Sequence, residues 1–595
     1  MVVQTSSQAT IPSDNHSKPK RTFSDVIVDY LKLFEVEYVF GVPGAHISSF
    51  YEALARSERK GGPRAILSCH ETGGAYMANG YARETGKIGV CCATAGPGAT
   101  NLITGVAAAY VDYTPLLVIT AQTLSFRFGQ GAFQESSPDN IDVTAMFKHC
   151  TRYSTVVTTP KLLEQKLAAA FTAALQSPQG PAHISIPIDL FNSPAPDSVS
   201  YPNLSQLLVN PSSNLDLTAL ETLCQILYDV LSQDRKVVLL VGRDSAGAAQ
   251  EIMAFAELIH ANVVTSPTGK PWVNPYHPLA RGVFGFVGHE TARQAVTDDT
   301  VDLILAVGTE LGQGSTSGWD SAVLNHKLVH IHHSNASFTR SPMARLHVHG
   351  TIKTIFEKLA TDIDTMQRNG KLRLPTPLTP SFSESHRELP CHPSQIAVKK
   401  PESYQLVDSS APIKPQRLIC KLVQDFPPET RFLSDVGNWM AWTIHYFFSK
   451  HPENYSFSIR TGAMGWAIGN AIGTAFGVPN TPVVCLTGDG SIIMNGQEIT
   501  VAVAKQLTVV FVILNDSSYG MVKYRHQQTG TETLEFALPP VDFSLMAKAM
   551  GAKGYTIRQT EDFEKLDLQA IYTYPGPTVL DVYIDKEEVP PIGMW

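Results

Sequence analysis

The chain has 595 residues, a formal net charge of −8, and 43% hydrophobic against 17% charged residues. At roughly 150 residues per domain this predicts about three to four globular domains, and the balance excludes a chain that is disordered throughout. The acidic charge without a long basic run argues against nucleic acid or an anionic membrane surface as partners, and no apolar run reaches the ~18 residues of a membrane helix.

The first 21 residues are polar and rich in serine, and they lack the apolar core of a signal peptide. We therefore expect a disordered tail over residues 1–21 and a cytoplasmic location. The eight cysteines are irregularly spaced, so they predict no disulfide framework. Cys91 and Cys92 fall in an apolar, strand-like run, which favours buried thiols.

Short apolar runs alternate with helical patterns from residue 22 onward. EYVF, AIL, IGVCCAT, PLLVITA and AHISIPI predict strands of a first domain over residues 22–195, and KVVLLVG, NVVTSP, DLILAVG and KLVHIHHS predict a second over 215–370. Residues 371–412 are rich in proline and serine and predict a surface linker, whereas TRFLSDVG, TPVVCLTGDG, LTVVFVILND and TVLDVYI predict a third domain over 413–595. The expected fold class is α/β, with three doubly wound parallel-sheet domains.

The third domain carries the most informative motif. One strand ends in Gly488-Asp489-Gly490-Ser491, and the next buried strand ends in Asn515-Asp516. The carboxyl ends of neighbouring parallel strands form the ligand edge of such a sheet, and the helix after Gly490 offers unpaired N–H groups to a phosphate. An isolated Gly-Asp-Gly turn would carry no function, but the second strand ending at the same edge favours a site for Mg²⁺ beside a phosphate.

This spacing resembles the binding motif of the thiamine diphosphate (ThDP) enzymes, and the resemblance extends from about residue 22 to the end. It implies a pyrimidine-binding domain, a central domain and a diphosphate-binding domain, in that order. The motifs are most similar to those of acetohydroxyacid (acetolactate) synthases and of carboligases of the benzaldehyde lyase type. By resemblance, Asp489, Asp516 and the backbone carbonyl of Ser518 are ligands of Mg²⁺, although Asp516 stands where Asn is commoner.

The resemblance also implies a set of cofactor-binding residues. Val436-Gly437-Asn438 is similar to the turn that contacts the diphosphate, and Met464 is similar to the apolar residue that supports the bent cofactor. The expected cofactor-binding residues are Glu71, Pro43, Gly437, Asn438, Gly462, Met464, Gly488, Gly490, Ser491, Tyr519, Gly520 and Met521.

Glu71, in SCHETGGAYMANGYAR, resembles the glutamate that binds the aminopyrimidine ring of ThDP and promotes loss of the C2 proton. More commonly, a glutamate in the first turn of a helix is explained by the helix dipole, which favours a negative charge there. That explanation does not account for the similarity to the family that continues through Gly80-Tyr81-Ala82-Arg83, so we expect a catalytic role for Glu71.

Several residues bear on the reaction. The His-His pair typical of simple decarboxylases is absent after Gly98, and GQGAFQES instead resembles the synthase segment in which Phe133 and Gln134 face the substrate. His46 matches a proton-relaying histidine of benzaldehyde lyase. Arg525 replaces a specificity tryptophan, and it either binds an acceptor carboxylate or solvates its loop.

The flavin of acetohydroxyacid synthases is doubtful here, because Thr309-Glu310-Leu311-Gly312-Gln313 replaces their Arg-Phe-Asp-Asp-Arg run. The resemblance implies a ThDP- and Mg²⁺-dependent carboligase or lyase that decarboxylates a 2-oxo acid donor and adds the acyl group to a second carbonyl compound, a 2-oxo acid or an aldehyde. Large or aryl donors are an open variant. A simple decarboxylase, a C–C hydrolase and an acyl-CoA lyase remain alternatives, whereas Glu71 and the metal pair disfavour a non-catalytic homologue. The family builds its sites between subunits, which implies a homodimer or homotetramer.

Overall fold

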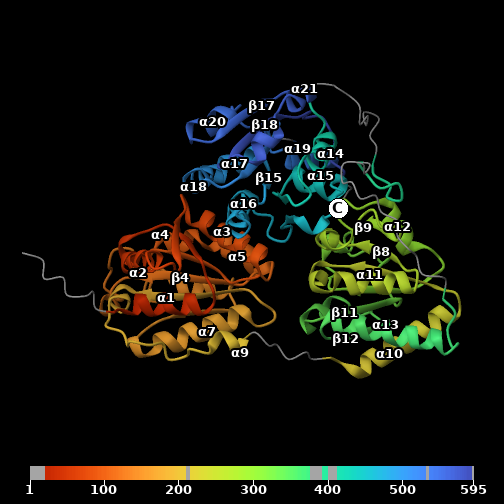
Figure 1. Ribbon diagram of the computed structural model, residues 1–595, viewed down its shortest axis with the longest axis horizontal. Helices are drawn as coiled ribbons and strands as arrows, with labels where there is room; N and C mark the ends of the chain where they lie inside the picture. Colours follow the sequence, from red (N-terminus) through yellow and green to blue (C-terminus); the bar gives the residue numbers. More distant parts are fainter. Residues whose placement is uncertain are drawn as a thin grey trace, which may run out of the picture.

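The computed structural model describes residues 21–208, 215–374, 391–399, 412–530, 532 and 535–592. Residues 1–20 of the predicted N-terminal tail lie outside the described residues. Three six-stranded sheets, each with only parallel neighbours, form three α/β units that lie around a common centre (Figure 1). This confirms the predicted fold class.

The N-terminal sheet has the strand order β2-β1-β3-β4-β6-β5. Its strands are β1 (Tyr38–Gly41), β2 (Arg64–Leu67), β3 (Gly89–Ala93), β4 (Leu116–Gln122), β5 (Tyr153–Val156) and β6 (Pro181–Pro187). Its helices are α1 (Phe23–Leu33), α2 (Ser48–Glu58), α3 (Glu71–Thr85), α4 (Pro97–Asn101), α5 (Ile103–Val111), α6 (Val143–Lys148), α7 (Leu163–Leu175), α8 (Ile188–Phe191) and α9 (Leu204–Leu208). As predicted, Cys91 and Cys92 are buried free thiols on β3.

The central sheet has the order β12-β11-β10-β7-β8-β9. Its strands are β7 (Lys236–Val241), β8 (Asn262–Thr265), β9 (Ala280–Val283), β10 (Val301–Val307), β11 (Leu328–His332) and β12 (Leu346–His349). Its helices are α10 (Leu217–Ser232), α11 (Ala249–Leu258), α12 (Glu290–Thr297) and α13 (Ile352–Arg368).

The C-terminal sheet has the order β14-β13-β15-β16-β18-β17. Its strands are β13 (Arg431–Ser434), β14 (Tyr455–Phe457), β15 (Val483–Gly488), β16 (Val509–Asn515), β17 (Lys553–Ile557) and β18 (Thr578–Tyr583). Its helices are α14 (Pro415–Asp425), α15 (Asn438–Tyr446), α16 (Trp466–Gly477), α17 (Asp489–Asn495), α18 (Ile499–Lys505), α19 (Gly520–Thr529), α20 (Phe543–Ala549), α21 (Thr560–Glu564) and α22 (Leu568–Tyr572).

The N-terminal and C-terminal domains share one hydrophobic core, because α3 packs directly on α16. Glycine permits this close approach: a Cβ at Gly473 would lie 2.0 Å from the carbonyl oxygen of Met77, and a Cβ at Gly80 would lie 2.1 Å from that of Asn470. The helix that begins at Glu71 is therefore held rigidly against the C-terminal domain.

Part of the predicted surface linker is buried instead. Within residues 391–399, Ile396 and Val398 join the core of the C-terminal domain, with 2% and 9% of their surface exposed. A disulfide joins Cys391 to Cys420 on α14. Composition favoured an irregular surface segment, but two apolar residues and this covalent bond hold the described stretch against the domain. Among the described residues, no helix is long and apolar enough to cross a membrane.

Candidate active site

A cavity of about 290 Å³ opens at the carboxyl edge of β13, β15 and β16 in the C-terminal domain. Its lining includes the apolar side chains of Leu514 and Ile584. Thirteen of the residues predicted from the sequence also line it: Gly437, Asn438, Gly462, Met464, Gly488, Asp489, Gly490, Ser491, Asp516, Ser518, Tyr519, Gly520 and Met521. Predicted residues from four separate stretches of chain therefore meet at this cavity.

Two carboxylates converge at this edge. Asp489 is the first residue of α17 and only 5% exposed, and Asp516 directly follows β16. The backbone N–H of Ser518 donates to both, at 3.1 Å to Asp516 Oδ1 and 3.3 Å to Asp489 Oδ2. Burial and the neighbouring Asp516 raise the pKa of Asp489 to about 7. A buried and a half-buried carboxylate that lie side by side suit a divalent cation with oxygen ligands, so these residues fit Mg²⁺.

The backbone around the cavity uses left-handed conformations that only glycine adopts freely. Gly437 has φ of 87° and Gly462 has φ of 61°, and neither would meet an atom within 4 Å if it carried a Cβ. Their open surroundings leave room for a ligand against the main chain. A Cβ at Gly490 would lie 2.9 Å from both Met464 Cε and Tyr519 Cε1. Met464 thus projects into the cavity beside the Gly-Asp-Gly turn, where it fits the predicted supporting role.

Asp435 holds this edge of the sheet together through hydrogen bonds, and its role was not predicted from the sequence. It is fully buried and accepts hydrogen bonds from the Gly465 N–H at 3.0 Å, the Thr487 hydroxyl at 3.0 Å and the Val436 N–H at 3.1 Å. It thereby ties the ends of β13 and β15 to the glycine turn before α16. Its place directly after the strand in RFLSDVG is the one signal that the sequence offers.

Glu71 is the first residue of α3, is 8% exposed, and accepts a hydrogen bond at 3.0 Å from the side-chain amide of Asn101. A second buried carboxylate lies close by: Glu498 accepts hydrogen bonds from the N–H groups of Cys69 and His70. Burial raises the pKa of Glu498 to about 7. Glu498 was not predicted from the sequence, because its contact with the turn before Glu71 joins two domains.

The other predicted residues of the N-terminal domain gather beside Glu71. His46 lies in a short 3₁₀ turn after β1, and the side chain of Gln134 lies close enough to its ring to influence its pKa. Burial lowers the pKa of His46, so the ring is neutral near pH 7. Pro43 is exposed on the same turn, and Phe133 is 80% exposed.

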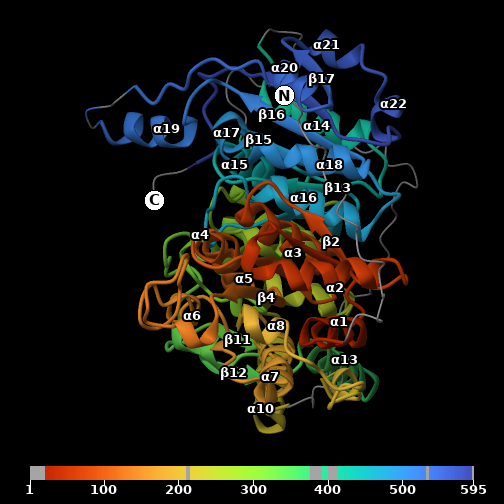
Figure 2. The same cartoon turned by 90° about the vertical axis from the view of Figure 1, so that its left-hand side faces the viewer.

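Neither this group nor Arg525 lines the cavity that contains Asp489. Arg525 lies on α19, a helix without buried residues that projects from the body of the molecule (Figure 2). The predicted residues thus form two separate groups in the structure. One contains the residues expected to bind the diphosphate, and the other those expected to bind the pyrimidine ring.

Three family models match the chain: the N-terminal thiamine pyrophosphate (ThDP) binding domain over residues 21–143, the central domain over 224–359 and the C-terminal binding domain over 435–582. The acetolactate synthase large subunit of Parasynechococcus marenigrum is 31% identical, with 94% of this chain and 87% of the relative covered. The chain belongs to the ThDP-dependent enzymes of the acetolactate synthase type. A probable acetolactate synthase large subunit of Methanocaldococcus jannaschii (29%; 96% and 94% covered) and the chloroplastic acetolactate synthase 1 of Nicotiana tabacum (29%; 99% and 85%) are similar over comparable lengths.

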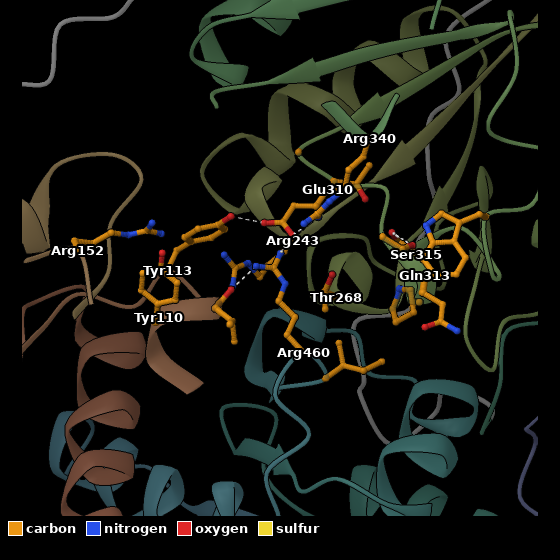
Figure 3. A pocket seen from close by; sticks show the side chains of 18 residues that line it. Tyr110, Tyr113, Arg152, Arg243, Thr268, Glu310, Gln313, Ser315, Arg340 and Arg460 are labelled. Carbon is orange, nitrogen blue, oxygen red and sulfur yellow. Dashed lines mark hydrogen bonds and ion pairs between the residues drawn. The ribbon is translucent and has the colours of Figure 1, made fainter. Parts of the chain in front are cut away.

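This ThDP enzyme has a second, larger cavity of about 720 Å³, where its three domains meet (Figure 3). Glu310 lies at its centre: it accepts a hydrogen bond from the Tyr113 hydroxyl at 2.6 Å and pairs with Arg460 at 2.9 Å and Arg340 at 3.0 Å. Arg243 reaches in from the end of β7, and its guanidinium lies 4.9 Å from the Tyr113 ring.

Acidic partners compensate most of the positive charge in this cavity. Arg243 pairs with Asp112 at 3.5 Å and with Asp244 at 3.3 Å, and Glu310 pairs with the two arginines already named. Only Arg152, which stacks on Tyr110 and Tyr113, has no carboxylate within 4.0 Å among the described residues. Three of the four arginines that line this cavity are therefore paired with carboxylates, whereas Arg152 Nη2 is buried without a hydrogen-bond partner.

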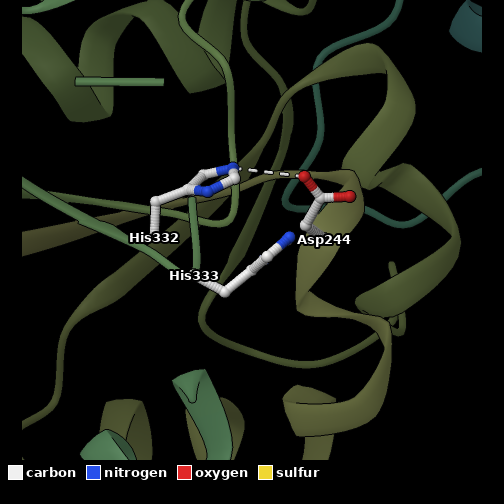
Figure 4. Close-up of side chains that lie close together, drawn as sticks. All are labelled: Asp244, His332 and His333. Atoms are coloured by element: carbon white, nitrogen blue, oxygen red, sulfur yellow. Dashed lines mark ion pairs between the residues drawn. The ribbon is translucent and has the colours of Figure 1, made fainter. Parts of the chain in front are cut away.

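His332 and His333 lie next to Asp244. His332 Nε2 lies 3.1 Å from Asp244 Oδ2, and the His333 ring stacks on the His332 ring at 4.6 Å (Figure 4). The Ser334 N–H donates to His332 Nδ1 at 3.0 Å, so the ring proton lies on Nε2, which faces Asp244 Oδ2 and lies 3.3 Å from the Ser337 hydroxyl. His332 thus faces the carboxylate that also pairs with Arg243.

Proposed function

We propose that this protein is a Mg²⁺- and ThDP-dependent carboligase that decarboxylates a 2-oxo acid and joins the acyl group to a second carbonyl compound. The convergence of Asp489 and Asp516 beneath a glycine-lined cavity is the observation that carries the proposal. The names of the relatives, all acetolactate synthases, support this reaction class.

The chain's own residues supply binding, orientation and proton control. Asp489, Asp516 and the Ser518 carbonyl would hold Mg²⁺ and, through it, the diphosphate, while Gly437 and Gly490 expose backbone to the phosphates. When bound, ThDP supplies a carbon nucleophile and an electron sink. Met464 would support the bent cofactor.

Glu71 would accept a hydrogen bond from the aminopyrimidine ring, where a buried carboxylate steadied by Asn101 can exchange a proton with the ring. His46 and the neighbouring Gln134 would orient the substrate oxygen and move protons at the new alcohol. Phe133, exposed at the same turn, would contact the substrate.

A second copy of the chain would complete each site. Glu71 and the cavity around Asp489 form separate groups within one chain, and large apolar side chains are exposed near both. Phe133 is 80% and Phe126 67% exposed in the N-terminal domain, and Met494 is 51% exposed on α17. Association would bury these side chains and place Glu71 of one copy over the cavity of the other, as a homodimer or a pair of dimers.

We propose that the residue that binds the acceptor substrate differs here from the one usual in the family. Arg525 would bind a carboxylate on the acceptor, since a guanidinium recognises a carboxylate through two parallel hydrogen bonds. Large or aryl 2-oxo acids are proposed as donors alongside small ones. We further propose that the enzyme works without a resident flavin, because of the ion pairs around Glu310.

The test is a panel of 2-oxo acid donors, small and aryl, each with and without a second 2-oxo acid or an aldehyde. The protein is supplied with ThDP and Mg²⁺, and the products are identified by mass. A 2-hydroxy ketone with loss of CO₂ supports the proposal. Aldehyde as the sole product would identify a simple decarboxylase instead. The absorption spectrum of the purified protein near 450 nm tests the flavin statement.

A further inference from the structure

Two polar atoms beside Glu71 are buried without a hydrogen-bond partner: the Thr94 hydroxyl and Nδ1 of His46. Buried polar atoms in folded proteins almost always have partners, because an unpaired one costs free energy of desolvation. At the edge of the candidate site, a bound ligand can supply the missing partner. Thr94 has no role in the function proposed so far.

The position of Thr94 follows from the sheet. It comes directly after β3, and β3 pairs with β1, so its side chain meets the turn that follows β1. A Cβ at Gly44 on that turn would lie 2.7 Å from Thr94 Oγ1. The hydroxyl therefore lies against the turn that carries His46.

Thr94 also borders Glu71. A Cβ at Gly98 would lie 2.8 Å from Thr94 Cγ2 and 3.3 Å from Glu71 Oε1, so the two side chains flank the same glycine. On the other side, a Cβ at Gly96 would lie 3.0 Å from Cβ of Gln134. Thr94 thus lies next to Glu71 across Gly98 and next to the turn of His46 across Gly44, while Gln134 borders Gly96, two residues further along the chain.

We propose that the Thr94 hydroxyl donates a hydrogen bond to an oxygen of the 2-oxo acid donor, which makes Thr94 a donor-binding residue. The inference rests on the proposed function. It assigns Thr94 to the donor because the donor reacts beside the pyrimidine end, which Glu71 holds, whereas the acceptor candidate Arg525 lies on α19 of the other domain.

Thr94→Val removes the hydroxyl and keeps the shape of the side chain. We expect an increase in the KM for the donor and a fall in kcat/KM by about 10- to 100-fold, the usual effect of losing one hydrogen bond to a charged ligand. The KM for the acceptor and the affinity for ThDP and Mg²⁺ should not change. Thr94→Ser, which keeps the hydroxyl, should return the donor KM to near the parent value.

Thr430→Val is the matched control. The Thr430 hydroxyl is likewise buried without a partner, and the residue is 1% exposed, but it precedes β13 at the sheet edge opposite to the cavity. Its loss should leave both KM values unchanged. The midpoint of thermal unfolding, measured for each variant, identifies any general damage to the fold.

The outcomes separate this inference from the proposed function. If the parent protein converts a donor and Thr94→Val leaves its KM unchanged, or raises the acceptor KM instead, the assignment of Thr94 is wrong while the function stands. A Thr94→Ser variant as impaired as Thr94→Val would also overturn it. If the parent converts no 2-oxo acid, the proposed function fails and the role of Thr94 falls with it.

Discussion

The carboxylate of Glu498 accepts a hydrogen bond from the backbone N–H of His70 at 2.9 Å, although 428 residues separate the two in sequence. Its second oxygen accepts the N–H of Cys69 at 3.1 Å. Both donors belong to the turn that ends in Glu71. The C-terminal domain therefore fixes the point from which α3 begins, and with it the direction of the Glu71 side chain.

Replacement of Glu498 tests this positioning. Glu498→Ala leaves two buried N–H groups unpaired, so we expect kcat to fall by more than about tenfold while ThDP still binds, because the Glu71 carboxylate loses its fixed orientation. Steady-state kinetics and cofactor titration measure the two effects. Glu564→Ala on α21, an exposed position, is the control. Unchanged kcat in Glu498→Ala would contradict a positioning role.

The raised pKa of Glu498 predicts how the stability of the protein depends on pH. Burial raises the pKa of Glu498 from 4.5 to about 7, so the folded protein keeps this proton at pH values where the unfolded chain has lost it. Its contribution to the free energy of unfolding is therefore fully present below pH 4.5 and is lost as pH rises to about 7. Glu498→Gln cannot titrate, so its stability relative to the parent should increase between pH 5 and pH 8 in urea unfolding. Parallel curves would contradict the shift.

The Asp489–Asp516 pair predicts a pH dependence of metal binding. Burial and Asp516 raise the pKa of Asp489 to about 7, so Mg²⁺ must displace a proton below that pH. The apparent affinity for Mg²⁺ should increase by up to about tenfold per pH unit until pH 7 and then level off. Calorimetric titration of Mg²⁺ in the presence of ThDP, from pH 5.5 to 8.5, measures this.

Asp516→Asn is the informative control for the metal site. It places the family's commoner residue at this position and removes the charge that raises the pKa of Asp489. Mg²⁺ should still bind, but its affinity should level off at a lower pH than in the parent. Asp489→Ala should lose Mg²⁺ and retention of ThDP. An unchanged pH profile in Asp516→Asn would show that the two carboxylates do not interact.

The motif at the cavity could be predicted from the sequence because its parts are local. Gly488-Asp489-Gly490 and Asn515-Asp516 each end an apolar run, and parallel pairing of β15 with β16 brings them together without further information. Glu498 could not be predicted in the same way, because its partner His70 lies in another domain. Likewise, the pairing of Glu310 with Arg460 depends on how the domains meet, which hydrophobic periodicity does not specify.

Glu71→Gln should retain the fold and bind ThDP and Mg²⁺ but lose nearly all turnover, since a neutral amide cannot exchange the proton that the pyrimidine ring requires. Circular dichroism, cofactor titration and product formation measure the three properties. The Asp489→Ala variant should also be inactive, but because it no longer binds the metal. Wild-type activity of Glu71→Gln would remove Glu71 from the mechanism.

Mixing these two inactive variants tests whether sites lie between subunits. A mixed dimer would contain one site with an intact Glu71 from one copy and an intact Asp489 from the other. Random pairing of the Glu71→Gln and Asp489→Ala chains should therefore recover about a quarter of the parent activity. If each site were formed within one chain, no mixture would be active. Co-expression with two different tags isolates the mixed species.

The disulfide between Cys391 and Cys420 predicts a redox effect on stability. It closes a loop of 29 residues in sequence separation and anchors residues 391–399, where the Lys399 N–H donates to His445 Nε2 at 2.8 Å at the end of α15. A loop of this length constrains the unfolded chain by about 3–4 kcal/mol. Reduction with a dithiol should therefore lower the midpoint of thermal unfolding, and Cys391→Ser should lower it equally.

The controls follow from the cysteine count. Thiol titration of the unfolded, unreduced chain should find six free thiols, and reduction should add two. A dithiol should have no further effect on the stability of Cys391→Ser, since that variant has no bond left to reduce. Because α15 begins at Asn438 in the cavity and ends against residues 391–399, reduction should also weaken the retention of ThDP. Eight free thiols before reduction would show that the two cysteines are not joined, and the stability argument would then have no basis.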